Sequence, residues 1–271
     1  MTLSPQVFAI VAHLIEEQTG LHYNIGDIDL LAEKLSDRTV ELGLASLLDY
    51  YYFLRYDEAG AAELNTLAQT LVVHETYFFR EYDGLRVMIE AILPEILRDR
   101  SKVRIWSTAC ATGEEPYTIA IMLAAANLLD RVEIVGSDLS ERALSRARAG
   151  IYGGRSFRVL PEAQYGKFFV EDGRGSRHVR DDLRGRIEWR RINLMDGRAI
   201  SALGIFDLVV CRNVLIYFSD ATVGRVAASL RDALVPGGLL LIGASESLLR
   251  FGNLFDCEER SGAFFYRKPR L

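Results

Sequence analysis

Cysteine, proline and long apolar runs are all scarce in this chain of 271 residues. The three cysteines, Cys110, Cys211 and Cys257, lie far apart and form no C-x-x-C pair, so the sequence predicts neither a disulfide framework nor a metal site. The longest apolar run, near residues 238–244, is far too short to span a bilayer, and no N-terminal targeting signal is visible. These absences favour a globular protein of the reducing cytoplasm with no direct membrane insertion.

Basic residues are scarce in the first part of the chain. The formal net charge is −5, and residues 1–73 contain 11 acidic but only three basic side chains. The rest of the chain is therefore slightly basic, which indicates two surfaces that meet different partners. The balance is not the strongly basic one that nucleic-acid binding requires, so no nucleic-acid partner is expected.

Residues 1–72 show apolar positions at helical spacing and predict a small all-α domain of three to five helices. The expected helices cover residues 4–20, 27–35, 44–56 and 59–73. Within the third, the run Tyr50-Tyr51-Tyr52 is interpreted as core and interface packing in preference to a binding site.

The most informative stretch, residues 103–117, reads as a short strand at 103–106, a turn of small residues and a helix start. We expect Pro116 at the first helical position, with the helix continuing over 117–129. Strand, tight turn and helix are the elements that open a nucleotide-type site in doubly wound α/β folds. The turn lacks G-x-G-x-x-G, which argues against a pyrophosphate, and Glu114 and Glu115 would repel a phosphate but attract an ammonium. A nucleoside with an amino-acid end, as in S-adenosylmethionine, fits better than NAD or ATP; an ordinary capped helix is the alternative.

Two further strands end in polar residues. The strand at 131–138 ends in Asp138, placed to accept both ribose hydroxyls. The buried strand at 208–211 is followed by Arg212 and Asn213 at its carboxyl end, and Tyr217 lies within one turn of Asn213. A Pro-Gly-Gly turn then leads into a strand at 239–243, and 263–267 is expected to close the sheet as an antiparallel strand.

Residues 73–84 read as a linker whose aromatic side chains anchor it while Thr76 and Arg80 point into a cleft. The alternative is a helix start with Thr76 as its cap and a solvated Arg80. A helix at 86–97 follows. Between about 165 and 192 a hairpin, at 168–170 and 178–180, and a strand at 187–192 predict an inserted antiparallel β-subdomain. Its basic character suits an added peptide strand or RNA, but a solvated face is the more ordinary interpretation.

Four segments occur in a characteristic order: His-Glu-Thr-Tyr-Phe-Phe-Arg-Glu from His74, Ala-Thr-Gly-Glu-Glu-Pro-Tyr-Thr from Ala111, Gly-Ser-Asp ending at Asp138, and Cys-Arg-Asn-Val-Leu-Ile-Tyr-Phe from Cys211. Together they resemble the CheR family of chemotaxis-receptor methyltransferases over nearly the whole chain. The resemblance implies a class I (Rossmann-like) α/β methyltransferase domain at 85–271, with its inserted β-subdomain, behind the helical domain and linker. It also implies a bacterial signal-transduction enzyme of the cytoplasm, recruited to receptor arrays, that transfers methyl from S-adenosylmethionine to receptor glutamates.

Carried across, the resemblance assigns Arg80 and Tyr217 to catalysis, Arg80 orienting the acceptor carboxylate and Tyr217 lying near the transferred methyl. The implied cofactor-binding residues are His74, Thr76, Arg80, Ala109, Glu115, Asp138, Asn193, Leu194, Arg212 and Asn213. The implied partners are the cytoplasmic methylation helices of chemoreceptors, with a receptor C-terminal peptide as a candidate at the β-subdomain.

Three features depart from the family pattern. His74 stands where relatives often have Asn, Gly243-Ala244-Ser245-Glu246 stands where they often have Gly-His-Ser-Glu, and the helical domain is acidic where relatives have a basic helix. An acidic surface would repel an acidic receptor segment, so docking would depend on the basic hairpin or on an unusual receptor. Two other functions remain open: methylation of RNA or a small molecule, and cofactor binding without catalysis. The chain is also compatible with being the catalytic part of a longer protein.

Overall fold

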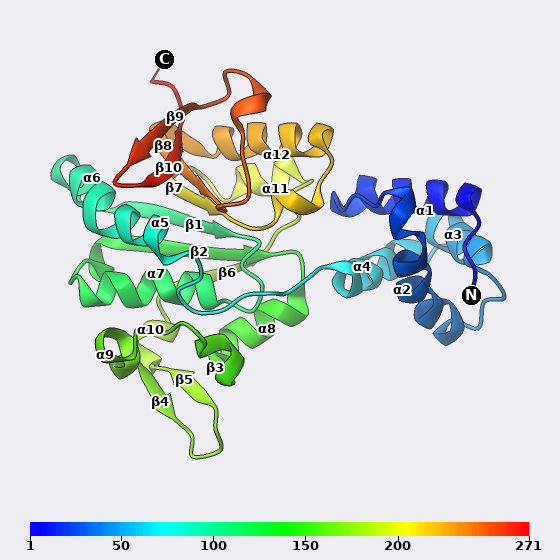
Figure 1. Ribbon diagram of the computed structural model, residues 1–271, viewed down its shortest axis with the longest axis horizontal. Coiled ribbons are helices and arrows are strands. Elements are labelled where there is room, and N and C mark those ends of the chain that lie inside the picture. Colours follow the sequence, from blue (N-terminus) through cyan, green and yellow to red (C-terminus); the bar gives the residue numbers. More distant parts are fainter. Residues whose placement is uncertain (271) are drawn as a thin grey trace.

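The computed structural model describes residues 1–270 and divides into a helical N-terminal part and a larger α/β part (Figure 1). The N-terminal helices are α1 (Pro5–Thr19), α2 (Ile28–Glu41), α3 (Leu47–Tyr56) and α4 (Gly60–Leu71). Helix α1 begins where the Ser4 hydroxyl accepts the amide N–H of Val7 and ends at Gly20, whose φ of 80° terminates the helix. The four helices share one apolar core that includes Tyr50, whereas Tyr52 is 52% exposed, so only part of the tyrosine run packs inside.

The α/β part is organised around a seven-stranded sheet of order β6-β2-β1-β7-β8-β10-β9. The strands are β1 (Val103–Thr108), β2 (Val132–Asp138), β6 (Ile187–Arg191), β7 (Phe206–Cys211), β8 (Leu234–Ile242), β9 (Asp256–Arg260) and β10 (Ala263–Arg267). The five strands from β6 to β8 are parallel, while β10 is antiparallel to both β8 and β9. The expected mostly parallel sheet is confirmed.

Helices cover both faces of this sheet (Figure 1). On one face lie α7 (Glu114–Ala125) and a continuous helical segment made of α5 (Tyr82–Val87), a π-helical turn (Met88–Ile92) and α6 (Leu93–Asp99). On the other face lie α11 (Gly197–Ala202) and α12 (Asp220–Asp232). Helix α8 (Glu141–Ala149) follows β2, and the Ser140 hydroxyl caps it by accepting the amide N–H of Ala143. The central strands β1 and β7 are thus buried on both sides, as their continuous apolar sequences require.

A second, three-stranded antiparallel sheet is inserted between α8 and β6. It consists of β3 (Ile151–Tyr152), β4 (Phe169–Glu171) and β5 (Arg177–Val179), with the short helices α9 (Glu162–Tyr165) and α10 (Asp181–Arg184) beside it. The predicted hairpin is β4–β5, but the limits of about 165–192 differ from the structure at both ends. The small sheet begins at Ile151, and residues 187–191 form β6, an edge strand of the main sheet.

Several element boundaries also differ from the sequence predictions. Helix α7 begins at Glu114 and ends at Ala125, so Pro116 is its third residue; a proline is tolerated there because amide groups of the first turn have no intrahelical partner. The Pro-Gly-Gly segment lies within β8, beside an irregular register with β7, and β9 was not predicted. No helix among residues 1–270 is long and apolar enough to cross a membrane.

Candidate functional site

A cleft lies at the carboxyl ends of β1, β2 and β7, between the α/β part and the helical domain. It consists of two adjoining hollows of about 40 Å³ and about 70 Å³ that share Val73, Ala109, Ala111 and Asn213. Thr76, Arg80, Glu115 and Arg212 line the first hollow; His74, Asp138, Asn193, Leu194 and Tyr217 line the second. The structure therefore brings all the predicted site residues into one cleft.

The turn between β1 and α7 forms the floor of this cleft. Ala109, Ala111 and Gly113 all have positive φ angles, of 47°, 49° and 92°. A Cβ atom on Gly113 would lie 2.6 Å from the Cβ of Ala147, so only glycine fits there. Ala109 and Ala111 hold a strained backbone conformation. Their methyl side chains are small, so they occupy little of the space above the floor of the cleft.

Asp138, at the end of β2, is nearly buried in the second hollow. Its two carboxylate oxygens accept the backbone N–H groups of Ala111 and Ser140, each at 2.8 Å. Each oxygen keeps a further lone pair, so the carboxylate can still accept two ribose hydroxyls. Burial raises the pKa of this carboxyl.

His74 lies beside Asp138 and is the one imidazole of the cleft. Its Nε2 atom is buried and has no hydrogen-bond partner within residues 1–270. Burial lowers the pKa of His74, which favours the neutral ring. A buried polar atom without a partner is costly, so this nitrogen is available to a ligand.

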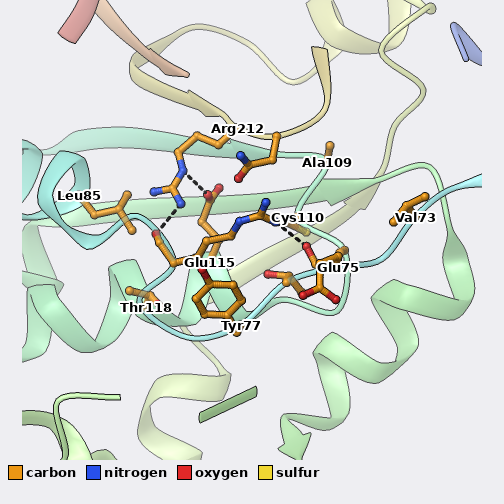
Figure 2. A pocket seen from close by; sticks show the side chains of 13 residues that line it. Val73, Glu75, Tyr77, Leu85, Ala109, Cys110, Glu115, Thr118 and Arg212 are labelled. Carbon is orange, nitrogen blue, oxygen red and sulfur yellow. Dashed lines mark hydrogen bonds and ion pairs between the residues drawn. The ribbon is translucent and has the colours of Figure 1, made fainter. Parts of the chain in front are cut away.

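Glu115 and Arg212 form a buried ion pair at the floor of the first hollow, and Figure 2 shows the two side chains pointing toward one another. Arg212 Nε lies 3.2 Å from Glu115 Oε2 without the alignment of a hydrogen bond, while Glu115 Oε1 accepts the Ser107 hydroxyl at 2.7 Å. Burial raises the pKa of Glu115. The sequence predicted a ligand ammonium at Glu115; the structure adds Arg212 as an internal partner that partly neutralises this carboxylate.

The linker that carries Thr76 and Arg80 is fixed on both sides. Phe78 and Phe79 are buried, and their amide N–H groups donate to the carbonyl of Ser156 and the hydroxyl of Thr118. The alternative of a helix start at Thr76 is wrong, because α5 begins at Tyr82.

Arg80 reaches across the first hollow toward its own linker. Its Nη1 donates to the Glu75 carbonyl at 2.6 Å, and its guanidinium lies 5.8 Å from the centroid of the Tyr77 ring. The carbonyls of Arg80 and Glu81 accept hydrogen bonds from Arg212 at 2.5 and 3.3 Å. The backbone of Arg80 is therefore held by Arg212, while its guanidinium has one hydrogen bond within residues 1–270, to a carbonyl that a ligand carboxylate could replace.

Two carboxylates that the sequence analysis did not assign to the site hold its loops. Glu246 accepts four backbone N–H groups, those of Gly243, Asn213, Val214 and Leu215, at 2.7–2.9 Å. Glu81 accepts hydrogen bonds from the side-chain amide of Asn213 at 2.8 Å and from the backbone N–H of Ala244 at 2.9 Å. Burial alone would raise the pKa of Glu81, but these hydrogen bonds lower it. The unusual Gly-Ala-Ser-Glu segment was the only sequence signal for Glu246.

The far wall of the second hollow belongs partly to the helical domain. Thr19 and Leu21 line it, the Asn193 amide donates to the Gln18 carbonyl at 2.6 Å, and the Tyr217 carbonyl accepts the N–H of His22 at 2.9 Å. Asn193 and Tyr217 thus join the cleft to α1 and the segment after it.

Comparison with known proteins identifies the family. A family model described as "CheR methyltransferase, SAM binding domain" matches residues 74–263. Chemotaxis protein methyltransferase 2 of Vibrio cholerae is 34% identical over 258 residues, which cover 93% of this chain and 89% of the relative. Chemotaxis protein methyltransferase 1 of Pseudomonas aeruginosa is 30% identical over 269 residues, covering 96% of this chain and 97% of the relative.

Among solved structures, the N-methyltransferase NodS of Bradyrhizobium japonicum in complex with S-adenosyl-l-homocysteine aligns with a TM-score of 0.40 and 16% identity, covering 68% of this chain and 87% of that chain. The family match and the sheet order confirm a class I methyltransferase fold whose cofactor is S-adenosylmethionine. The chain belongs to the CheR methyltransferase family.

Proposed function

We propose that this protein transfers methyl groups from S-adenosylmethionine to glutamate side chains of chemotaxis receptors, giving glutamyl methyl esters. The observation that carries the proposal is the composition of one cleft: a buried acid suited to a ribose at one end, and the guanidinium of Arg80 at the other. The names of the curated relatives, chemotaxis protein methyltransferases, support the setting.

The residues present fit the cofactor. Asp138 accepts the ribose hydroxyls, His74 Nε2 gains a partner from the nucleoside, and Asn193 with Leu194 bounds the adenine side. At the amino-acid end, Glu115 meets the ammonium, and Thr76, Arg212 and Asn213 enclose it with Ala109. When bound, the cofactor supplies an electrophilic methyl on a cationic sulfur.

The two hollows are smaller than the roughly 300 Å³ at which ligand pockets usually begin. Arg80 crosses the first hollow to reach Glu75, so its side chain must turn away as the cleft fills. A guanidinium that leaves a carbonyl is then available to a carboxylate, which attracts it more strongly because the carboxylate carries the opposite charge.

The acceptor glutamate needs no general base, since a carboxyl with a reference pKa of about 4.3 is already ionised at neutral pH. The protein's contribution is alignment, which is worth up to roughly 7–11 kcal/mol, together with exclusion of water. Arg80 orients the carboxylate through a long or shared contact, because a tight pair would quench the nucleophile. Tyr217 assists from the wall of the second hollow.

The proposed partners are the cytoplasmic methylation helices of receptors, which places the enzyme in the cytoplasm beside receptor arrays. The acidic helical domain does not suit an acidic receptor segment, so the basic residues of the β-subdomain are the proposed docking surface, with a receptor C-terminal peptide as a candidate ligand.

The test is incubation with labelled S-adenosylmethionine and receptor cytoplasmic fragments, followed by base treatment. Glutamyl esters release methanol under base, whereas methyl groups on nucleic acid bases or amines do not. Base-labile label that maps to glutamates supports the proposal. Base-stable label, or cofactor binding without transfer to any fragment, would contradict it.

A further inference from the structure

A third hollow, of about 600 Å³, adjoins the cofactor cleft. It lies where β8 ends and β10 begins, under the start of α5, and its lining includes Arg212 of the first hollow. The volume is in the range of ligand pockets and far exceeds that of either cofactor hollow. The end of β7, the end of β8 and the start of β10 lie side by side in the sheet. A ligand in the third hollow would therefore lie next to the first hollow, where the methionine end of the cofactor is proposed to bind.

The polar floor of the third hollow is already paired within the chain. Glu246 accepts four backbone N–H groups, Glu81 accepts two hydrogen bonds, and Arg212 binds Glu115 and two carbonyls. Asp83, whose side chain is 85% exposed, stands at the rim, 3.6 Å from Arg86. A charged or strongly polar ligand would therefore gain few new contacts and would lose its water.

The walls are apolar. Leu241 and Ala263 are buried at the base, while Leu249 and Phe264 stand at the rim with 69% and 60% of their surface exposed. Phe264 alternates with the buried Ala263 and Phe265 along β10, so its side chain lies on the same side of the strand as Tyr266, which also lines the hollow at this end of the sheet. Burying these two exposed side chains is favourable and requires an apolar occupant.

We propose that the third hollow is an acceptor subsite that takes an aliphatic or aromatic side chain of the protein substrate, on the same face as the glutamate that is methylated. The proposal rests on the proposed function, since the acceptor must approach the cleft to present its carboxylate. The subsite adds binding energy outside the reacting atoms and selects among glutamates by their neighbours.

The experiment measures methanol-releasing methylation of a receptor cytoplasmic fragment by the full chain. Phe264→Ala and Leu249→Ala should each raise the KM for the fragment by about tenfold, the effect of a partly exposed side chain that becomes buried. Turnover and the Kd for S-adenosylhomocysteine should remain unchanged, because a contact made equally in the ground and transition states alters only KM. Ile205→Ala is the matched control, because Ile205 is 49% exposed and precedes β7 at the amino end of the strand, away from the third hollow.

A second measurement needs no loss of a side chain. Cys257 lines the third hollow and is exposed, whereas Cys110 and Cys211 are buried, so a maleimide should modify Cys257 selectively and fill the hollow. Alkylation should raise the same KM, and Cys257→Ser should abolish that effect. Methylation with an unchanged KM in both variants and in the alkylated enzyme would overturn the subsite alone. Failure of the wild-type enzyme to make base-labile esters would overturn the proposed function, and the subsite with it.

Discussion

Glu246 offers the sharpest test of how the cleft is assembled. Its carboxylate holds four backbone N–H groups, three of them in the loop Asn213–Leu215 that follows β7. Asn213 has a φ of 58°, a left-handed conformation that is uncommon outside glycine although asparagine tolerates it better than most residues, and it borders both hollows of the cleft. The carboxylate therefore fixes a loop that would otherwise relax.

Glu246→Gln keeps the shape of the side chain but replaces one carboxylate oxygen by an NH₂ group. This group is itself a donor, so it cannot accept the two backbone N–H groups that the oxygen accepted. Hydrogen bonds to a charged acceptor contribute about 1.5–3 kcal/mol each when buried. Glu246 is partly buried, so water replaces part of each lost bond and we expect a net cost of about 2 kcal/mol. Because this cost falls on the loop that borders the cleft, the Kd for S-adenosylhomocysteine should rise about ten- to thirtyfold.

Isothermal titration calorimetry with S-adenosylhomocysteine measures this change, and thermal unfolding separates it from global destabilisation. Glu258→Gln is the control, since Glu258 accepts bonds from Arg260 and Arg267 at the far edge of the sheet, and it should lower stability slightly without changing affinity. An affinity within twofold of the wild type for Glu246→Gln would refute the positioning role.

Three other predictions concern the cleft. Arg80→Ala should lower turnover by at least about tenfold, by loss of a charge-assisted contact, with a smaller change in cofactor affinity; steady-state kinetics that show turnover within a few-fold of normal would remove Arg80 from the mechanism. Asp138→Asn should weaken S-adenosylhomocysteine binding by about tenfold or more in calorimetry, and an unchanged Kd would exclude the ribose contact. Burial raises the pKa of Asp138 and of Glu115, and the ionised forms are the ones that accept hydroxyl or ammonium protons. Affinity should therefore be full at higher pH and decline as the pH falls through these raised pKa values, earlier than for an exposed carboxylate; a titration series that stays flat from pH 8 down to about pH 4, where an exposed carboxylate protonates, would contradict this.

The sequence predicted those features whose cause is local. Small residues between Thr108 and Gly113, an acid at the end of β2, and polar residues after β7 all follow from the need to place ligands at the carboxyl edge of a parallel sheet. The limits of the first helix are equally local: the expected span of residues 4–20 is that of α1 together with its two capping residues, Ser4 and Gly20.

Features that depend on distant partners were not predictable. The strand β6 resembles part of the inserted hairpin in sequence, and only its pairing with β2 assigns it to the main sheet. Trp189 on β6 packs so close to Gly136 that a Cβ there would lie 2.7 Å from the indole, a contact between residues more than 50 positions apart. Glu246 was not assigned to the site for the same reason: three of its four hydrogen-bond donors lie more than 30 residues earlier in the chain.

The helical domain is not a detachable adaptor. Thr19 and Leu21 form part of the second hollow, the proposed cofactor site, and the Asn193 side chain donates a hydrogen bond to the Gln18 carbonyl in the last turn of α1. Exchanging residues 1–72 for those of a relative would consequently change the wall of the second hollow, and with it the affinity for S-adenosylmethionine. The helical domain and the α/β part have to evolve together, because both contribute side chains to one cleft.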